Sequence, residues 1–216
     1  MKKYLTEFIG TFFLVLTIGL AVASGSPLAP LAIGSALMVL VYMGGHVSGA
    51  HYNPAVTIAI VALGKMERSE VLPYIGAQVV GAFAAAATSF VIAGETFAPA
   101  PAADASMLAV LLVEFLFTFM LVLVILNVAA SKATESNSYY GLAIGFTITA
   151  AAFVGGGISG GAYNPAVGIG SVVMNALAGD GGFADLWIYL VAPIAGGLLA
   201  TVIFNIQEAE KEQAYA

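Results

Sequence analysis

The sequence has no cysteine and very little charge. Of its 216 residues only 8% are charged, six are Lys or Arg and two are His. The absence of cysteine excludes disulfides, thiolate metal sites and thiol nucleophiles. The six basic residues form no patch, so no nucleic-acid partner is expected. The two histidines, His46 and His51, lack a serine or acidic partner at catalytic spacing, so the sequence predicts neither an enzyme nor a metal or cofactor site.

Apolar residues, in contrast, make up 61% of the chain. This is more apolar surface than a soluble domain of this length can bury, so we expect an integral membrane protein. Six membrane-spanning helices are predicted, at about residues 4–23, 31–43, 69–87, 107–130, 139–154 and 186–206. Two shorter segments, about 54–63 and 165–177, fall short of the ~20 residues that a span needs, so we predict half-helices that begin at Pro54 and Pro165.

The first apolar segment has an alternative interpretation. Lys2 and Lys3 before an apolar run are also typical of a cleaved signal peptide. However, Glu7 interrupts the run, and the pattern around Glu7 recurs around Glu114. A removable leader would not be duplicated inside the mature chain, so a first membrane helix is favoured.

One stretch of the sequence occurs twice. Residues 44–56 read GGHVSGAHYNPAV and residues 155–167 read GGGISGGAYNPAV. Both copies contain polar residues and proline in the middle of an otherwise apolar chain. The duplication indicates that these two stretches perform the same task in two halves of the protein.

We therefore predict a single membrane channel domain over residues 1–216. It is built from repeats at about 4–93 and 107–206 and ends in a polar tail, 207–216. Each repeat has three spans, and an odd number of spans inverts the second copy relative to the first. The functional site is expected where the inverted copies meet near the bilayer midplane.

The basic residues all fall on one side of this topology. They are Lys2, Lys3, Lys65, Arg68, Lys132 and Lys211. The loops on the other side, 25–30, 94–106 and 179–185, contain no basic residue. The positive-inside rule then predicts that both termini are cytoplasmic, in a multi-pass protein of the cell membrane.

The repeated stretches place irregular chain at membrane depth, where it is tolerated only inside the protein or along a water-filled cavity. We expect glycine-rich loops at 44–50 and 155–161 whose carbonyl groups line such a cavity. Each is followed by an Asn-Pro-Ala motif, formed by Asn53, Pro54 and Ala55 in the first copy and by Asn164, Pro165 and Ala166 in the second. Asn is a favoured N-cap and Pro is favoured at the first helical position, so each motif begins a half-helix.

Two half-helices of opposite direction would meet with the positive ends of their dipoles facing the cavity. Each end carries about half an elementary charge. A neutral solute exchanges hydrogen bonds with Asn53 and Asn164, whereas a cation meets an electrostatic barrier from both directions. The prediction is a passive channel for water and small uncharged solutes that excludes ions.

These motifs resemble the major intrinsic protein family, the aquaporins and aquaglyceroporins. The resemblance also includes the Glu7 and Glu114 pair and the Ala77-Gln78 and Gly81-Ala82 dipeptides, and it extends over residues 6–204. It implies an all-helical, right-handed bundle of six helices with two re-entrant half-helices, one pore per subunit and a homotetramer in the bilayer.

The resemblance also implies roles for three residues outside the Asn-Pro-Ala motifs. In the family the residues that match Glu7 and Glu114 brace the two pore loops, and His51 matches a pore-loop residue near the cytoplasmic mouth. Intramembrane carboxylates can instead mark a proton or ion path. The repeat symmetry of the two glutamates, and the need of buried amides for acceptors, favour the structural role.

The outer constriction of the family, carried over to this sequence, falls on Ile33, Ala152, Gly161 and Val167. The family usually has Arg at the position of Val167, and water-selective members typically have an aromatic residue and a His at the first two positions. We therefore predict a wider and less strictly water-selective channel. The alternative is a broader pore for glycerol, urea, ammonia or other gases, although the Asp that glycerol-selective members usually carry is replaced by Gly168.

Two other classes of membrane protein are less favoured. A coupled secondary transporter also uses inverted repeats and broken helices, but it needs a carboxylate or cation site at the midplane, where here only Asn side chains are expected. An ion channel would need a ring of charge or a carbonyl filter shared between subunits. Neither requirement is evident in the sequence.

Overall fold

Apolar helices form almost the whole of the structure, a computed structural model that describes residues 1–214, with side chains through Ala209. In chain order the helices are α1 (Lys2–Ala23), α2 (Ala29–Ser48), α3 (Pro54–Ala62), α4 (Val71–Ala93), α5 (Met107–Ile125), α6 (Tyr140–Ser159), α7 (Pro165–Ala178) and α8 (Ile188–Ala214). Short 3-10 turns at Arg68–Glu70 and Lys132–Thr134 and a π-helical segment at Leu126–Ala130 complete the regular structure of this part of the chain.

Six of the described helices are long and apolar enough to cross a membrane. They are α1, α2, α4, α5, α6 and α8, which are the six spans that the sequence predicted. The shorter helices α3 and α7 begin at Pro54 and Pro165, as expected from proline at a first helical position. The predicted fold class is therefore confirmed.

The predicted glycine-rich loops are wrong over most of their length. Residues 44–48 and 155–159 are helical, because α2 continues to Ser48 and α6 to Ser159. Both helices end one residue later at a glycine with a left-handed backbone, Gly49 with φ of 85° and Gly160 with φ of 86°. Glycine adopts this conformation without a Cβ clash, so the helix end is set by Gly49 and Gly160 rather than by the first glycines of each stretch.

The polar tail, predicted over 207–216, is helical as far as the structure describes it. Through Ala214 these residues continue α8, while 215–216 lie outside the described residues. Ser131 donates to a carboxylate oxygen of Glu208 at 2.9 Å, and Asn127 donates to the side-chain oxygen of Gln207 at 3.1 Å. The polar end of α8 is thus attached to the connection between α5 and α6.

The two half-helices pack against the opposite half of the molecule. Helix α3 packs mainly on α8, and α7 packs mainly on α4. The largest helix contacts are α1 with α4, α5 with α8 and α2 with α6. The last of these pairs also joins the two halves, so the bundle cannot be divided into two separately packed units.

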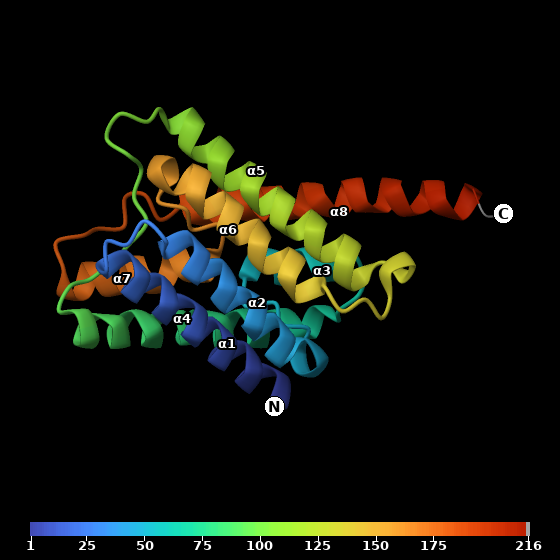
Figure 1. Cartoon of the computed structure of the whole chain (residues 1–216), viewed down its shortest axis with the longest axis horizontal. Coiled ribbons are helices and arrows are strands. Elements are labelled where there is room, and N and C mark those ends of the chain that lie inside the picture. The colour runs from blue at the N-terminus through green and yellow to red at the C-terminus, as the bar shows by residue number, and fades with distance from the viewer. Residues whose placement is uncertain (215–216) are drawn as a thin grey trace.

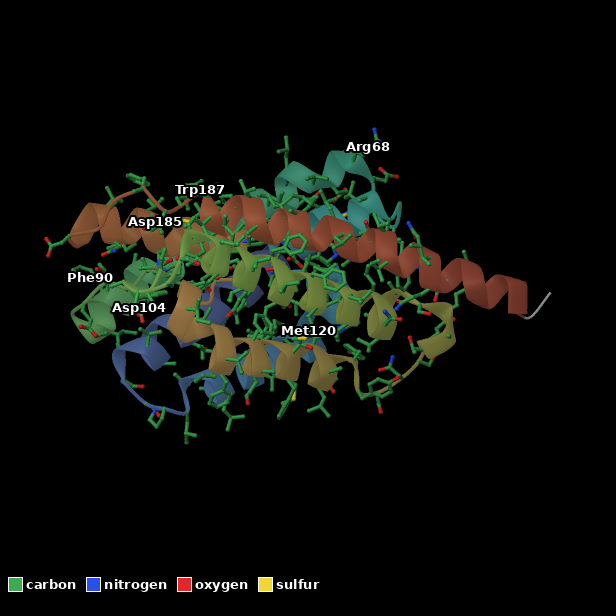
Figure 2. All side chains as sticks on the ribbon, turned by 90° about the horizontal axis from the view of Figure 1, so that it is seen from above. Arg68, Phe90, Asp104, Met120, Asp185 and Trp187 are labelled. Atoms are coloured by element: carbon green, nitrogen blue, oxygen red, sulfur yellow. The ribbon has the colours of Figure 1, made fainter. Side chains whose placement is uncertain are left out.

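The ends of the bundle differ in charge. Figure 1 shows the α1–α2, α4–α5 and α7–α8 connections at one end and the α5–α6 connection and the C-terminus of α8 toward the other. Figure 2 labels Asp104, Asp185 and Trp187 at the first end and Arg68 near the second. Lys3 pairs with Glu70 at 2.6 Å, and Lys65 donates to the Ala130 carbonyl at 2.7 Å. These contacts place Lys3 and Lys65 at or near the second end, and Lys132 belongs to the α5–α6 connection there. The side chain of Lys211 is not described.

Helices α2 and α6 cross at a pair of glycines. A Cβ atom added to Gly145 would lie 2.5 Å from the Gly34 carbonyl oxygen, and a Cβ added to Gly34 would lie 2.5 Å from that of Gly145. Small residues allow such close approach of membrane helices.

We expect Gly145→Leu to destabilise the protein because the leucine side chain would meet backbone rather than a movable side chain. Overpacking of this kind costs about 1–3 kcal/mol, which should lower the melting temperature in detergent. Gly76→Leu is the matched control, since no atom lies within 4 Å of a Cβ at this helical glycine. Equal melting temperatures for the two variants would contradict the proposed close crossing.

Candidate functional site

The two Asn-Pro-Ala motifs form the N-termini of α3 and α7 with nearly identical geometry. Asn53 and Asn164 have extended backbones, with φ of −155° and −156°. Their side-chain oxygens accept the backbone N–H of Ala55 and Ala166, each at 2.9 Å. Each Asn therefore caps its own half-helix, as N-cap asparagines do.

The same asparagines also connect the two loops to each other. The side-chain amide of Asn53 donates to the Tyr163 carbonyl at 2.9 Å, and that of Asn164 donates to the Tyr52 carbonyl at 2.8 Å. The sequence predicted the amide donors but not this reciprocal exchange. An Asn amide has two N–H donors, and in both residues the second one has no partner among the described residues.

Glu7 of α1 binds the first loop with both carboxylate oxygens. Oε1 accepts the Ser48 hydroxyl at 2.6 Å and the His51 backbone N–H at 3.0 Å, and Oε2 accepts the Tyr52 backbone N–H at 2.7 Å and the Gln78 amide at 2.8 Å. The carboxylate is fully buried, and no basic side chain in the described part of the chain is paired with it. Hydrogen bonds therefore stabilise this carboxylate in place of a counter-ion.

Glu114 of α5 binds the second loop in the same way but with one donor fewer. Oε1 accepts the Ser159 hydroxyl at 2.7 Å and the Ala162 N–H at 3.0 Å, and Oε2 accepts the Tyr163 N–H at 2.7 Å. It is also fully buried. The structure thus brings each predicted glutamate to its loop, and neither glutamate lines the cavity described below.

Two tyrosines hold the loops in a strained conformation. Tyr52 and Tyr163 have φ of 48° and 49°, a left-handed region that bulky residues rarely occupy. Their hydroxyls donate to the carbonyls of Leu40 and Ala151, each at 3.0 Å. Such strain persists only where the surroundings over-determine it, and here the glutamates and the tyrosine hydroxyls do so.

A cavity of about 240 Å³ lies where the two loops meet. Its lining includes Asn53, Asn164 and His51, together with the four predicted constriction residues, Ile33, Ala152, Gly161 and Val167. Pro54, Ala55, Pro165 and Ala166 are absent from the lining and lie in the buried interior. Most of the other lining side chains are branched aliphatic residues of α1, α2, α5 and α6.

A second hollow of about 530 Å³, here called the vestibule, adjoins this cavity and was not predicted. The two share Val41, Ala50, Ile125 and Ile144 in their linings. The vestibule is walled largely by residues 128–137 of the α5–α6 connection and by Lys65. No motif in the sequence marks this wall, because its shape depends on how a polar connection folds back over the bundle.

This fold, with six membrane-length helices and two capped half-helices beside a cavity, is that of a multi-pass integral membrane protein. The family described as Major intrinsic protein matches residues 1–204. The chain therefore belongs to the major intrinsic protein family, whose members are channels and not enzymes, as the motifs indicated.

Individual relatives agree with this assignment. The chain is 36% identical to glycerol uptake facilitator protein-like 6 of Lactiplantibacillus plantarum, over 97% of this chain and 100% of the relative. It is 32% identical to aquaporin NIP1-2 of Arabidopsis thaliana, over 95% of this chain and 74% of the relative. The X-ray structure of the aquaglyceroporin from Plasmodium falciparum superposes with a TM-score of 0.86 at 25% identity, over 94% of both chains.

We expect Glu7→Gln and Glu114→Gln to destabilise the protein by similar amounts. An amide NH2 cannot accept a hydrogen bond, so each substitution leaves one loop N–H unpaired, whereas the Ser48 and Ser159 hydroxyls can turn and accept from the new NH2. Each hydrogen bond to a charged group contributes about 1.5–3 kcal/mol. Thermal unfolding in detergent measures the losses, and a wild-type melting temperature for either variant would contradict the bracing role.

Proposed function

We propose that the protein is a passive channel for water and small uncharged solutes. The observation that carries this proposal is the placement of Asn53 and Asn164. Both line the cavity and cap opposed half-helices, and each has one amide N–H that is unpaired among the described residues. A solute that passes between them can replace part of its hydration with these donors. Membership of the major intrinsic protein family supports the same conclusion.

Ions are excluded in this proposal by the two half-helix N-termini. Each N-terminus carries about half a positive elementary charge. The cavity lining, as far as the structure describes it, contains no Asp, Glu, Lys or Arg. A cation would therefore lose its hydration without gaining a counter-charge, which is strongly unfavourable.

Ile33, Ala152, Gly161 and Val167 are proposed to form the outer constriction. All four line the cavity, and none of their side chains has a hydrogen-bond donor. The family usually has an Arg at the position of Val167, so this constriction should be wider and less polar. It should admit solutes larger than water.

A broader neutral-solute pore, with little selectivity for water, is the second candidate. It is favoured by the aliphatic cavity lining and by the similarity to a glycerol uptake facilitator-like protein and an aquaglyceroporin. Glycerol, urea and ammonia are the test solutes for this candidate. A coupled transporter is not favoured, because Glu7 and Glu114 are used in loop contacts away from the cavity.

The surroundings of the channel are also part of the proposal. The clustering of the described basic residues supports a cytoplasmic position for both termini in the cell membrane. We infer a homotetramer with one pore per subunit from family membership. The vestibule would then open to the cytoplasm, and the constriction residues would lie on the opposite side of the asparagines.

Proteoliposomes that contain the protein should exchange water and glycerol faster than empty liposomes in stopped-flow light scattering. We expect Val167→Arg to reduce glycerol flux more than water flux, because a long charged side chain would narrow the constriction. Val167→Met is the control for added length without charge. If wild-type liposomes matched empty ones in both gradients, the channel proposal would be wrong; if Val167→Arg left glycerol flux unchanged, Val167 would not be at the constriction.

The absence of native cysteine allows a direct test of orientation. Ala103 and Ala133 are exposed residues in the α4–α5 and α5–α6 connections. We expect Ala103→Cys to react with a membrane-impermeant maleimide on intact cells, and Ala133→Cys to react only after permeabilisation. The reverse pattern would place both termini outside.

A further inference from the structure

Three polar residues of the first half have apolar counterparts in the second half. The matching positions, taken from the motif alignment and from the paired glycines Gly81 and Gly196, are His51 with Ala162, Thr57 with Gly168 and Gln78 with Pro193. In the structure the three polar side chains are neighbours that form one hydrogen-bonded chain. Gln78 also donates to Glu7, but the contacts from Gln78 through Thr57 to His51 occur in only one half, so the symmetric framework of the two loops does not account for them.

The first member of the chain, Gln78, has an amide whose orientation is fixed by Glu7. Its Nε2 atom donates to Glu7 Oε2 at 2.8 Å and to Thr57 Oγ1 at 3.0 Å. The amide oxygen is buried and has no partner among the described residues. Reversing the amide would place this oxygen against a carboxylate, so Gln78 acts as a donor toward Thr57.

Thr57 then determines the role of the imidazole. Its hydroxyl oxygen contacts three groups: the Gln78 amide at 3.0 Å, the Asn53 carbonyl at 3.2 Å and His51 Nδ1 at 3.1 Å. A hydroxyl has one hydrogen to donate and two lone pairs to accept with. The Asn53 carbonyl can only accept and the Gln78 amide donates, so all three contacts are hydrogen bonds only if His51 Nδ1 carries a hydrogen.

The other imidazole nitrogen, Nε2, is then an acceptor. It has no hydrogen-bond partner among the described residues and is not enclosed by protein atoms. It lies 3.2 Å from the position of a Cβ added to Gly49. His51 lines the main cavity and Gly49 lines the vestibule, so Nε2 is placed at the junction of the two.

We propose that Gln78 and Thr57 are positioning residues that hold neutral His51 with its proton on Nδ1. The unprotonated Nε2 then accepts hydrogen bonds from the O–H or N–H groups of solutes at the inner end of the cavity. This inference rests on the proposed channel function. The asparagines supply donors and His51 supplies an acceptor, so a solute with both kinds of group is bonded at successive positions along the path.

The tautomer is tested by nitrogen-15 NMR of histidine-labelled protein in liposomes, at a pH well above the ordinary histidine pKa of about 6.5. His46 is exposed and lines neither hollow, so His46→Gln leaves His51 as the single labelled residue. We expect the shift of a protonated Nδ1 and a bare Nε2, whereas free neutral histidine favours the proton on Nε2. A protonated Nε2 in this protein would overturn the assignment.

In the same His46→Gln background, Thr57→Val should move the proton toward Nε2. Loss of one hydrogen bond should change the tautomer ratio by about two- to tenfold. Thr118→Val is the matched control, because Thr118 is a buried threonine whose hydroxyl donates to the Glu114 carbonyl of its own helix. Equal tautomer ratios in the two variants would contradict the role of Thr57.

Glycerol flux gives a second measurement. We expect Thr57→Val to lower the flux about two- to tenfold and Thr57→Ser, which keeps the hydroxyl, to restore it. In a His51→Leu background Thr57→Val should have no further effect, because the group that Thr57 positions is gone. Additive losses, or equal losses for Thr57→Val and Thr57→Ser, would show a merely structural role. A wild-type protein that conducts nothing would refute the channel, while the NMR result would still decide the tautomer.

Discussion

Backbone amides that lie inside a membrane without a helix must find acceptors within the protein, and two buried carboxylates meet this requirement here. Glu7 and Glu114 each accept two loop amides and a serine hydroxyl. Without them the non-helical turns would bury unpaired donors inside the protein, at a cost of several kcal/mol per group. The N-caps, the strained tyrosines and the cavity between the loops all depend on these two side chains.

Much of the fold follows from local sequence. Long apolar runs predicted the six spans, and proline after asparagine predicted where α3 and α7 begin. The ends of α2 and α6 were misplaced because several glycines compete for the helix end, and only backbone geometry identifies Gly49 and Gly160 as the left-handed residues. The polar tail continues α8 because it consists of strong helix formers, whereas its contacts with the α5–α6 connection could not be read from local sequence.

The candidate site was likewise predicted from the sequence only in part. Ile33, Ala152 and Val167 were selected by the resemblance to the family, and the structure brings them to one cavity. The reciprocal bonds from each Asn to the opposite loop could not be predicted, because they join residues 110 or more positions apart. The vestibule and the Gln78–Thr57 contact were missed for the same reason: they are set by how separate helices pack, and not by periodicity or motif.

The exchange of half-helices between the two halves has a consequence for synthesis. Ribosomes deliver α3 to the membrane well before α8, the helix on which α3 packs. Until the last helix arrives, α3 has neither that partner nor the bond from Asn53 to the second loop. The nascent first half is therefore an incomplete folding unit, and closure of the site is a late event that couples the two ends of the chain.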